Sequence, residues 1–372
     1  QLARYGNSLM GAQVRVEVVS VGHYNPSTPS VSAKSLPAAS ISDVRFAFAS
    51  PLGVAVAYKN YTSTNKAYIS TDDGSTWSAF TLPTSSGWQN VVSNGTYFGI
   101  SGSWSSVNLF LRSSDGSNWS QTSLGSKWSI VNNQMCASGS TWCMCVRYGY
   151  TDYVNISTDN GIHWAESALP AQLSNFLRCA AAGERFFVFS YGTAFYRSDD
   201  GGSSWSSKTF PSSLGLLELC YDSANGVLYG LTHPDGNSYH YVLSSTDFGE
   251  TWSTPKRVGA AHRTWGGLNY CNGWLLAAAD GYVSWSSDGG NTWTDFFTNY
   301  GTSSAYDLVQ SPVAHASEFY VSFGQSGVNY RVVSAPAASG GIIPDLVPLS
   351  TIVSAECLRT GLLSPGDIDT SN

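Results

Sequence analysis

Three aspartates and two cysteines are the residues of this chain whose types and spacing could do chemistry. Asp152, Asp235 and Asp280 fall in stretches of loop composition, and two carboxylates about 5 to 9.5 Å apart can hydrolyse a glycosidic bond. Cys143 and Cys145 alternate on one predicted strand and so share a face, but no histidine or cysteine pair at ligand spacing accompanies them. Phosphate-binding glycine loops, zinc-binding helices and G-x-S-x-G elbows do not occur. We therefore expect no metal and no cofactor, with a non-catalytic role favoured over glycoside hydrolysis.

The elements that would position these residues are spaced by a repeated octapeptide, S-x-D-x-G-x-x-W, which occurs six times. The first copy is Ser70–Trp77, and the copy at Ser113–Trp119 is one residue short. The aspartates stand 41 to 47 residues apart, and a fixed period near this length is typical of propellers and solenoids. The Asp and Trp positions of the six copies are Asp72, Trp77, Asp115, Trp119, Asp159, Trp164, Asp200, Trp205, Asp247, Trp252, Asp288 and Trp293.

Each octapeptide lies between two short strand-like stretches, which predicts a hairpin turn. The Asp side chain can accept hydrogen bonds from the turn's own N–H groups, and glycine supplies the positive φ of a tight turn. The Trp would pack the hairpin onto the neighbouring layer. These residues resemble the Asp-box (BNR) repeat of sialidase-like β-propellers over roughly residues 40 to 336. The resemblance implies that the octapeptides are structural turns on the face opposite the ligand site.

The repeat predicts an all-β fold, a seven-bladed β-propeller of four-stranded antiparallel blades. Six blades with octapeptides span about 41–83, 88–124, 128–170, 176–211, 216–258 and 263–299. The unit at 305–336 has three predicted strands, and Ala335–Pro336 stands where the turn should be. The alternating stretch Gln13–Val21 would add the missing strand and close the ring. A six-bladed ring with 305–336 outside it is the alternative.

The domain interpretation follows from this plan. Residues 1–40 are a strand (13–21) and a Pro- and Ser-rich linker, 41–336 are the propeller, and 337–372 are an extended C-terminal arm. Within the arm Ile342–Ser350 is apolar, and its two prolines exclude a regular helix. Such an arm either straps its own domain or binds a partner subunit, and we favour the partner.

Ligand binding is expected at the loops between second and third strands and between blades, on the face opposite the octapeptides. Aromatic side chains among Ser, Gly and Asn make a surface suited to glycan or protein. Packing beneath their own loops is the alternative for each of them. The candidates are Trp88, Trp104, Trp128, Tyr148, Tyr150, Tyr153, His240, Arg263 and Trp265.

Sialidase activity is not expected, although the fold resembles that family. The resemblance would require three arginines that converge on a carboxylate, the first in an F/Y-R-I-P motif. Arg45 lies in DVRFAF and lacks the Ile-Pro, while Arg112 and Arg197 directly precede octapeptides and so belong to the other face. Only Arg263 is expected on the loop face.

The net charge and the positions of the cysteines limit which partners and which cellular setting we expect for the protein. With a net charge of −7 and 18 scattered Lys and Arg residues, nucleic acid is not an expected partner. No apolar run approaches a membrane span. Of the seven cysteines, Cys136, Cys179, Cys220 and Cys271 recur near the ends of first strands, which indicates buried core thiols rather than a disulfide framework.

We therefore expect a non-catalytic binding or structural propeller, typical of a virion surface (tail or capsid decoration) or of an adhesin-type module. It would lie on a virion or extracellular surface after assembly in a reducing cytoplasm. It would bind glycan or protein through the loop face and partner subunits through the terminal segments, 337–372 above all. A glycoside hydrolase and an envelope assembly factor are the alternatives.

Overall fold

A computed structural model of the chain describes residues 29–37, 43–58, 64–104, 107–124, 135–148, 151–173, 177–211, 213–259, 265–279, 282–297, 313–315, 318–322 and 329–334. These residues form strands and turns and contain no helix. They all belong to one compact unit, Pro29–Ala335; residues 1–28 and 336–372 make up a second unit. The predicted strand 13–21 and the predicted arm 337–372 therefore lie outside the described residues.

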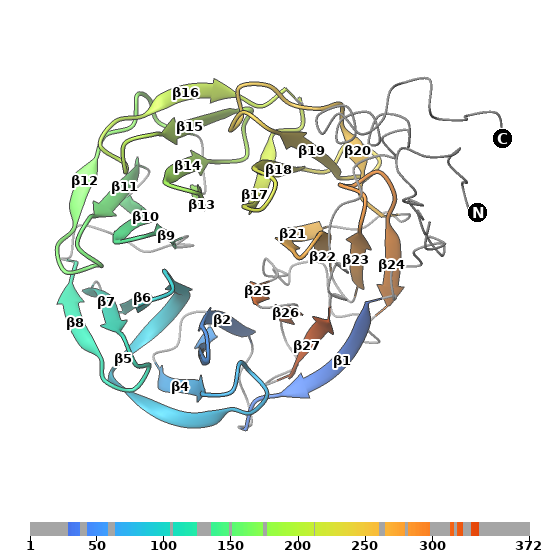
Figure 1. The fold of residues 1–372 in the computed structure, drawn as a ribbon. Coiled ribbons are helices and arrows are strands. Elements are labelled where there is room, and N and C mark those ends of the chain that lie inside the picture. The colour runs from blue at the N-terminus through green and yellow to red at the C-terminus, as the bar shows by residue number, and fades with distance from the viewer. Residues whose placement is uncertain are drawn as a thin grey trace, which may run out of the picture. The chain divides into compact units, whose positions relative to one another are not determined.

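The described strands form antiparallel sheets whose first strands, such as β9, β13 and β17, lie innermost around a centre (Figure 1). The fold is a β-propeller, as the repeat predicted. Four of the sheets have four strands in chain order. The first is β9 (Met135–Ser138), β10 (Thr141–Tyr148), β11 (Thr151–Ser157) and β12 (Ala165–Ser167), and the second is β13 (Arg178–Ala182), β14 (Arg185–Phe189), β15 (Ala194–Ser198) and β16 (Ser206–Thr209). The third is β17 (Leu216–Asp222), β18 (Val227–Thr232), β19 (Tyr241–Ser245) and β20 (Lys256–Arg257). A fourth is β21 (Trp265–Cys271), β22 (Trp274–Ala279), β23 (Tyr282–Ser286) and β24 (Thr294–Phe297).

One sheet has seven strands, because a single long strand serves two four-stranded sets. Its order is β2 (Asp43–Ala49), β3 (Leu52–Tyr58), β4 (Thr64–Ser70), β5 (Ser78–Ser93), β6 (Phe98–Trp104), β7 (Val107–Ser113) and β8 (Ser120–Ser123). The first part of β5 pairs with β4 and its second part, from Gly87, with β6. The sequence predicted a break at Pro83. The strand continues there because Pro83 falls in the register shift between Thr81 and Ser86, where no ladder N–H is needed.

The remaining sheet joins the two ends of the unit. Its order is β1 (Ser30–Ser35), β27 (Asn329–Ser334), β26 (Glu318–Ser322) and β25 (Val313–His315), with β1 antiparallel to β27 from Ser30↔Ser334 to Ser35↔Asn329. Figure 1 shows the N-terminal β1 beside the C-terminal β27. Ser30–Ser35 was interpreted as linker and 13–21 as this strand, so the position of the joining strand is corrected. An outer strand pairs through its backbone, and the sequence SVSAKS needs no apolar alternation to do so.

The octapeptides are the turns between third and fourth strands, and their side chains bond within the turn. In the copy at 198–205, Gly202 N donates to Ser198 Oγ (2.7 Å), Ser198 Oγ donates to Asp200 Oδ1 (2.8 Å), and Asp200 Oδ1 also accepts from Ser204 N (2.8 Å). The aspartates of the other five copies accept equivalent bonds. The Asp carboxylates are thus engaged in their own turns.

Each turn also packs against the sheet that precedes it in the ring. A Cβ added to Gly202 would lie 2.5 Å from Ile156 Cδ1 of β11, and Gly202 has a φ of +88°. The same close approach recurs at Gly74 on Tyr320, Gly116 on Ile69, Gly161 on Phe110, Gly249 on Phe195 and Gly290 on Val242. Polar side chains add to it: Arg112, Arg197, Lys256 and Tyr320 donate to carbonyls of the next turn, at Asn160, Phe248, Gly289 and Asp73 respectively. Glycine is needed at this position for both its φ and its missing side chain.

This packing predicts how much stability the protein loses when one methyl group is added at a turn glycine. Gly202→Ala should destabilise the protein by about 2 to 4 kcal/mol, since an Ala at positive φ costs roughly 1 kcal/mol and overpacking against Ile156 adds about 1 to 3. Gly183→Ala is the matched control, because Gly183 has a φ of +60° and nothing within 4 Å of an added Cβ. Urea unfolding measures both. Equal losses for the two variants would show that the contact between sheets contributes nothing.

The carboxylates of the octapeptide turns also predict that the free energy of unfolding decreases at acidic pH. Hydrogen bonds, first from the Ser204 hydroxyl, lower the pKa of Asp200 from 3.8 to about 2, and those from Thr251 do the same for the pKa of Asp247. Because the folded pKa lies below the unfolded one, this stabilisation is complete above 3.8 and is lost as the pH falls toward 2. Unfolding free energies measured between pH 5 and pH 2 should fall less steeply for a D200N/D247N variant than for the wild type. An unchanged slope would contradict the assignment.

Candidate functional site

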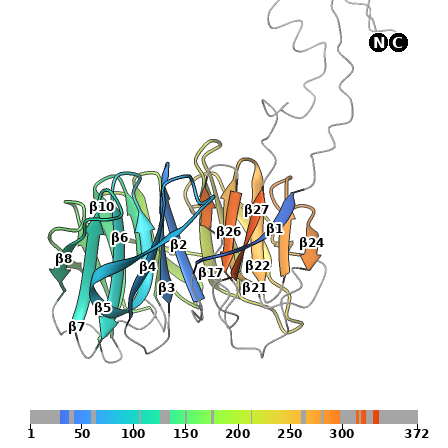
Figure 2. The same ribbon diagram turned by 90° about the horizontal axis from the view of Figure 1, so that it is seen from below.

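The loop face is the end of the sheets opposite the octapeptide turns. Consecutive antiparallel strands place the octapeptide turns and the first-to-second turns at one end, and the second-to-third turns and inter-sheet connections at the other. Figure 2 shows the strands upright, so these two sets of turns lie at opposite ends. Described parts of the loop face include 190–193, 210–211, 213–215 and 233–240.

Three of the predicted ligand-binding residues are buried, so the prediction that they form an exposed binding surface is wrong. Trp88 and Trp265 pack into the core because each lies over a glycine: a Cβ on Gly102 would lie 2.5 Å from Trp88, and one on Gly259 would lie 2.8 Å from Trp265. The imidazole of His240 is buried with its Nδ1 2.7 Å from the Thr232 carbonyl oxygen. The sequence placed all three in loops, whereas Trp88 lies in β5 and Trp265 begins β21, and the three side chains are buried.

Of the other six predicted residues, the structure describes the side chain of one. Tyr153 is half-buried and packs against a core cluster that contains Trp142 and Phe110. Trp104 and Tyr148 end β6 and β10, and their side chains lie outside the description. Trp128, Tyr150 and Arg263 lie outside the described residues.

Of the carboxylates considered for hydrolysis, Asp235 holds its own loop together. Its Oδ1 accepts from Asn237 N (2.8 Å) and Tyr239 N (2.9 Å), and its Oδ2 accepts from the Tyr241 hydroxyl (2.8 Å). The side chain of Asp152 and the whole of Asp280 lie outside the description. Within the described residues, these loops therefore bring together no pair of carboxylates poised for glycoside hydrolysis.

The structure instead brings together a loop-face cluster of Arg178, Tyr191, Glu218, His233 and His240. Arg178 Nη1 lies 3.0 Å from Glu218 Oε2, and the two side chains are only 17% and 8% exposed. Tyr191 is 44% exposed, and its ring centroid lies 4.3 Å from that of His233 in an edge-to-face arrangement. Sequence analysis assigned Arg178 and Glu218 no role. The sequence did carry a signal, because two opposite charges stand 40 residues apart, about one repeat, near the starts of two mostly apolar strands.

Electrostatics keeps both histidines of the cluster neutral. Burial, with the nearby charge of Arg178 and with His240, lowers the pKa of His233 from 6.5 to about 4. Burial likewise lowers the pKa of His240 to about 4, against the bond to the Thr232 carbonyl. Among the described residues neither buried Nε2 atom has a hydrogen-bond partner. The cluster thus combines an exposed phenol ring, neutral imidazoles and one ion pair.

The described residues also contain no helix long and apolar enough to cross a membrane.

Comparison with known proteins gives the fold and no family. No family model matches the chain, and no curated protein matches it. Among solved structures, "YCF48 bound to D1 peptide" has a TM-score of 0.61 at 18% identity and covers 84% of this chain and 96% of its own. YCF48 from Cyanidioschyzon merolae has a TM-score of 0.59 at 16% identity, over 81% of this chain and 98% of its own.

A glycoside hydrolase has the same fold. The GH74 enzyme of Niastella koreensis has a TM-score of 0.61 at 13% identity over 80% of this chain, which spans 53% of the enzyme. At these identities the likeness shows the fold alone. That fold occurs both in a protein that binds a peptide and in an enzyme.

The neutral histidines predict a pH window for stability that differs from that of the turn aspartates. Since the folded pKa of His233 is about 4 and the unfolded value 6.5, the unfolded chain binds more protons between these values. Stability should therefore be highest above pH 6.5 and fall as the pH decreases to about 4. NMR titration of the imidazole Cε1–H signals should place both inflections near pH 4 in the folded protein and near the ordinary value in urea. A folded inflection near 6.5 for His233 would overturn the assignment.

Proposed function

We propose that the protein is a non-catalytic binding propeller of seven blades, whose loop face binds a segment of another protein or a glycan. The observation that carries the proposal is the exposed ring of Tyr191, set edge-to-face with His233 beside the largely buried Arg178–Glu218 ion pair. An exposed aromatic ring above a rigid polar base is typical of a binding surface, because the ring supplies contact area at a small cost in side-chain entropy. The ion pair fixes Arg178, whose planar guanidinium can meet a carboxylate or hydroxyl of the ligand.

Two further observations favour binding over hydrolysis. Asp235 is engaged in closing its own loop, and the turn aspartates are engaged in theirs. A propeller of the same fold was determined with a peptide bound. Glycoside hydrolysis remains the second candidate because a GH74 enzyme shares the fold; it would need two carboxylates about 5 to 9.5 Å apart.

The setting proposed for this activity is a virion or extracellular surface. The octapeptide turns, with their Ser–Asp–Gly hydrogen bonds and packed Trp, support membership of the Asp-box propellers. The low content of charged residues, 12%, and the apolar stretch within 337–372 support attachment to a partner subunit through the arm. An envelope assembly factor is the alternative setting.

The proposal predicts that one exposed ring determines affinity. Screened on glycan and peptide arrays, the wild-type protein should bind at least one class, and Tyr191→Ala should weaken that binding about tenfold or more, as loss of an aromatic hot spot does. Its melting temperature should change little because Tyr191 is exposed. Ile162→Ala is the control, since Ile162 is 45% exposed on an octapeptide turn at the other face.

The same glycans should be incubated with the protein and their reducing ends counted. Turnover of any glycan would establish the hydrolase instead. Binding that survives Tyr191→Ala but not Ile162→Ala would place the ligand at the octapeptide face and refute the proposed site.

A further inference from the structure

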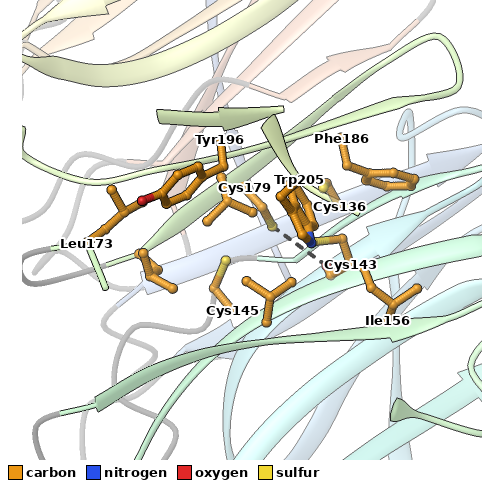
Figure 3. Close-up of a cluster of buried hydrophobic side chains, with 12 residues drawn as sticks. Cys136, Cys143, Cys145, Ile156, Leu173, Cys179, Phe186, Tyr196 and Trp205 are labelled. Carbon is orange, nitrogen blue, oxygen red and sulfur yellow. Dashed lines mark hydrogen bonds between the residues drawn. The ribbon is translucent and has the colours of Figure 1, made fainter. Parts of the chain in front are cut away.

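Four buried thiols gather between two neighbouring sheets, in a group that the sequence scattered over 44 positions (Cys136 to Cys179). Cys136 lies in β9, Cys143 and Cys145 in β10, and Cys179 in β13 of the next sheet (Figure 3). The Sγ atoms of Cys136, Cys143 and Cys179 all lie within 4.8 Å of one another. Sequence analysis discounted a metal site at Cys143 and Cys145 because no further ligands were at hand. The fold supplies them from two other strands.

Strand register explains how the thiols meet. Cys143 and Cys136 are direct partners across the β9–β10 ladder, so their side chains leave the sheet on the same face. Cys145 follows two residues later and shares that face. Cys179 comes from the innermost strand of the facing sheet, and its Sγ lies 3.6 Å from the Cys143 carbonyl oxygen. Three strands of two sheets therefore aim their sulfur atoms into one layer.

The layer around the thiols is apolar and closed to solvent. Cys136, Cys143, Cys145 and Cys179 are 9%, 0%, 3% and 6% exposed. Their neighbours in the cluster include Ile156, Leu173, Phe186 and Trp205, several of which are drawn in Figure 3. Cys220 and Cys271 are buried in other layers. They belong to no such group within the described residues.

The geometry is close to that of a thiolate metal site. Sulfurs bound tetrahedrally to Zn²⁺ at about 2.3 Å lie roughly 3.8 Å apart. The Sγ atoms of Cys136, Cys143 and Cys179 lie within 4.8 Å of one another, so these three require a contraction of at most about 1 Å. Small χ1 rotations can supply this without moving the strands. Thiolates are soft ligands that select Zn²⁺, Cu⁺ and similar ions over Mg²⁺ or Ca²⁺.

We propose that Cys136, Cys143 and Cys179 bind a thiophilic metal ion, with Cys145 as the fourth ligand. The ion joins the sheet β9–β12 to the sheet β13–β16. Each thiol that binds releases one proton, so Zn²⁺ with three thiolates leaves a net charge of −1 and with four a net charge of −2. The layer is dry, and removal of the ion leaves three or four neutral thiols packed together, which the apolar walls tolerate. The folded protein therefore exists both with and without the metal.

A disulfide is the competing use of the same atoms. Cys136 and Cys143, as direct ladder partners, are the pair that an oxidant would join. A disulfide there would remove two of the four proposed ligands, so the two uses exclude one another and can be told apart by mass.

The test uses the full chain, reduced and freed of metal by a chelator. Zn²⁺ titrated against a chromophoric chelator should bind with one ion per chain, and Co²⁺ should give the intense thiolate charge-transfer and tetrahedral visible bands. Cys143→Ala and Cys179→Ala should weaken Zn²⁺ binding by at least about 100-fold, more than the 10- to 100-fold typical of losing an outer-shell partner. Cys220→Ala and Cys271→Ala are the matched controls and should bind as the wild type does.

Every outcome decides the proposal. Stoichiometric binding lost in the cluster variants and kept in the controls supports it, as does an increase in wild-type melting temperature with Zn²⁺ but not with Mg²⁺. Substoichiometric Zn²⁺ binding by the reduced wild type, or equal binding by all four variants, overturns it. An intact mass lighter by two hydrogen atoms as isolated, with no Zn²⁺ binding after reduction, would assign the cluster to the disulfide instead. The wild-type titration stands even where a variant fails to fold.

Discussion

The close packing of each octapeptide turn against the preceding sheet is the contact on which the rest of the structure depends. A four-stranded sheet on its own leaves two faces exposed, and it becomes stable only when both are covered by neighbours. In this protein the turn glycine lets the backbone rest directly on a side chain of the neighbouring sheet, such as Ile156 beneath Gly202. At three other turns a basic side chain of the neighbouring sheet also donates to a carbonyl of the turn, as Arg197 does to Phe248. The spacing between sheets is thus set at the octapeptide end wherever an octapeptide turn packs on the neighbouring sheet.

Large aromatic side chains fill these layers, and this explains why exposed loop aromatics were overestimated from the sequence. Among the described residues, the buried indole N–H groups of Trp88, Trp142 and Trp265 have no hydrogen-bond acceptor. Leaving such a group unpaired costs about 1 to 3 kcal/mol, which the burial of a ring of this size offsets. These tryptophans therefore serve to fill volume, and each lies over a glycine: Trp88 over Gly102, Trp142 over Gly99 and Trp265 over Gly259. A Trp next to a loop in the sequence does not reveal whether its ring faces solvent or the neighbouring sheet.

The sequence could predict the features that follow from the spacing of the repeats, namely the fold and the face of the turns. It could not predict the contacts that residues of different repeats make with one another. A spacing of 41 to 47 residues between turn aspartates predicted the β-propeller and the face on which the octapeptides lie. It could not predict that Ser30–Ser35 pairs with β27, because an outer strand is held by backbone bonds that leave no side-chain pattern. Nor could it predict the Arg178–Glu218 pair or the thiol cluster, since each is assembled from different repeats across a layer.

Strand β13 links the two assemblies, because its consecutive residues point into opposite layers. Cys179 and Ala181 pack in the layer toward β9–β12, whereas Ala180 and Ala182 pack in the layer toward β17–β20. By the same alternation Arg178 reaches Glu218 of β17 while its neighbour Cys179 reaches Cys143 of β10. A metal ion bound at Cys179 would thus hold the strand that carries Arg178, one residue from the loop-face cluster. The proposed metal site and the proposed binding face share one rigid element, so the cysteines can influence ligand binding without touching the ligand.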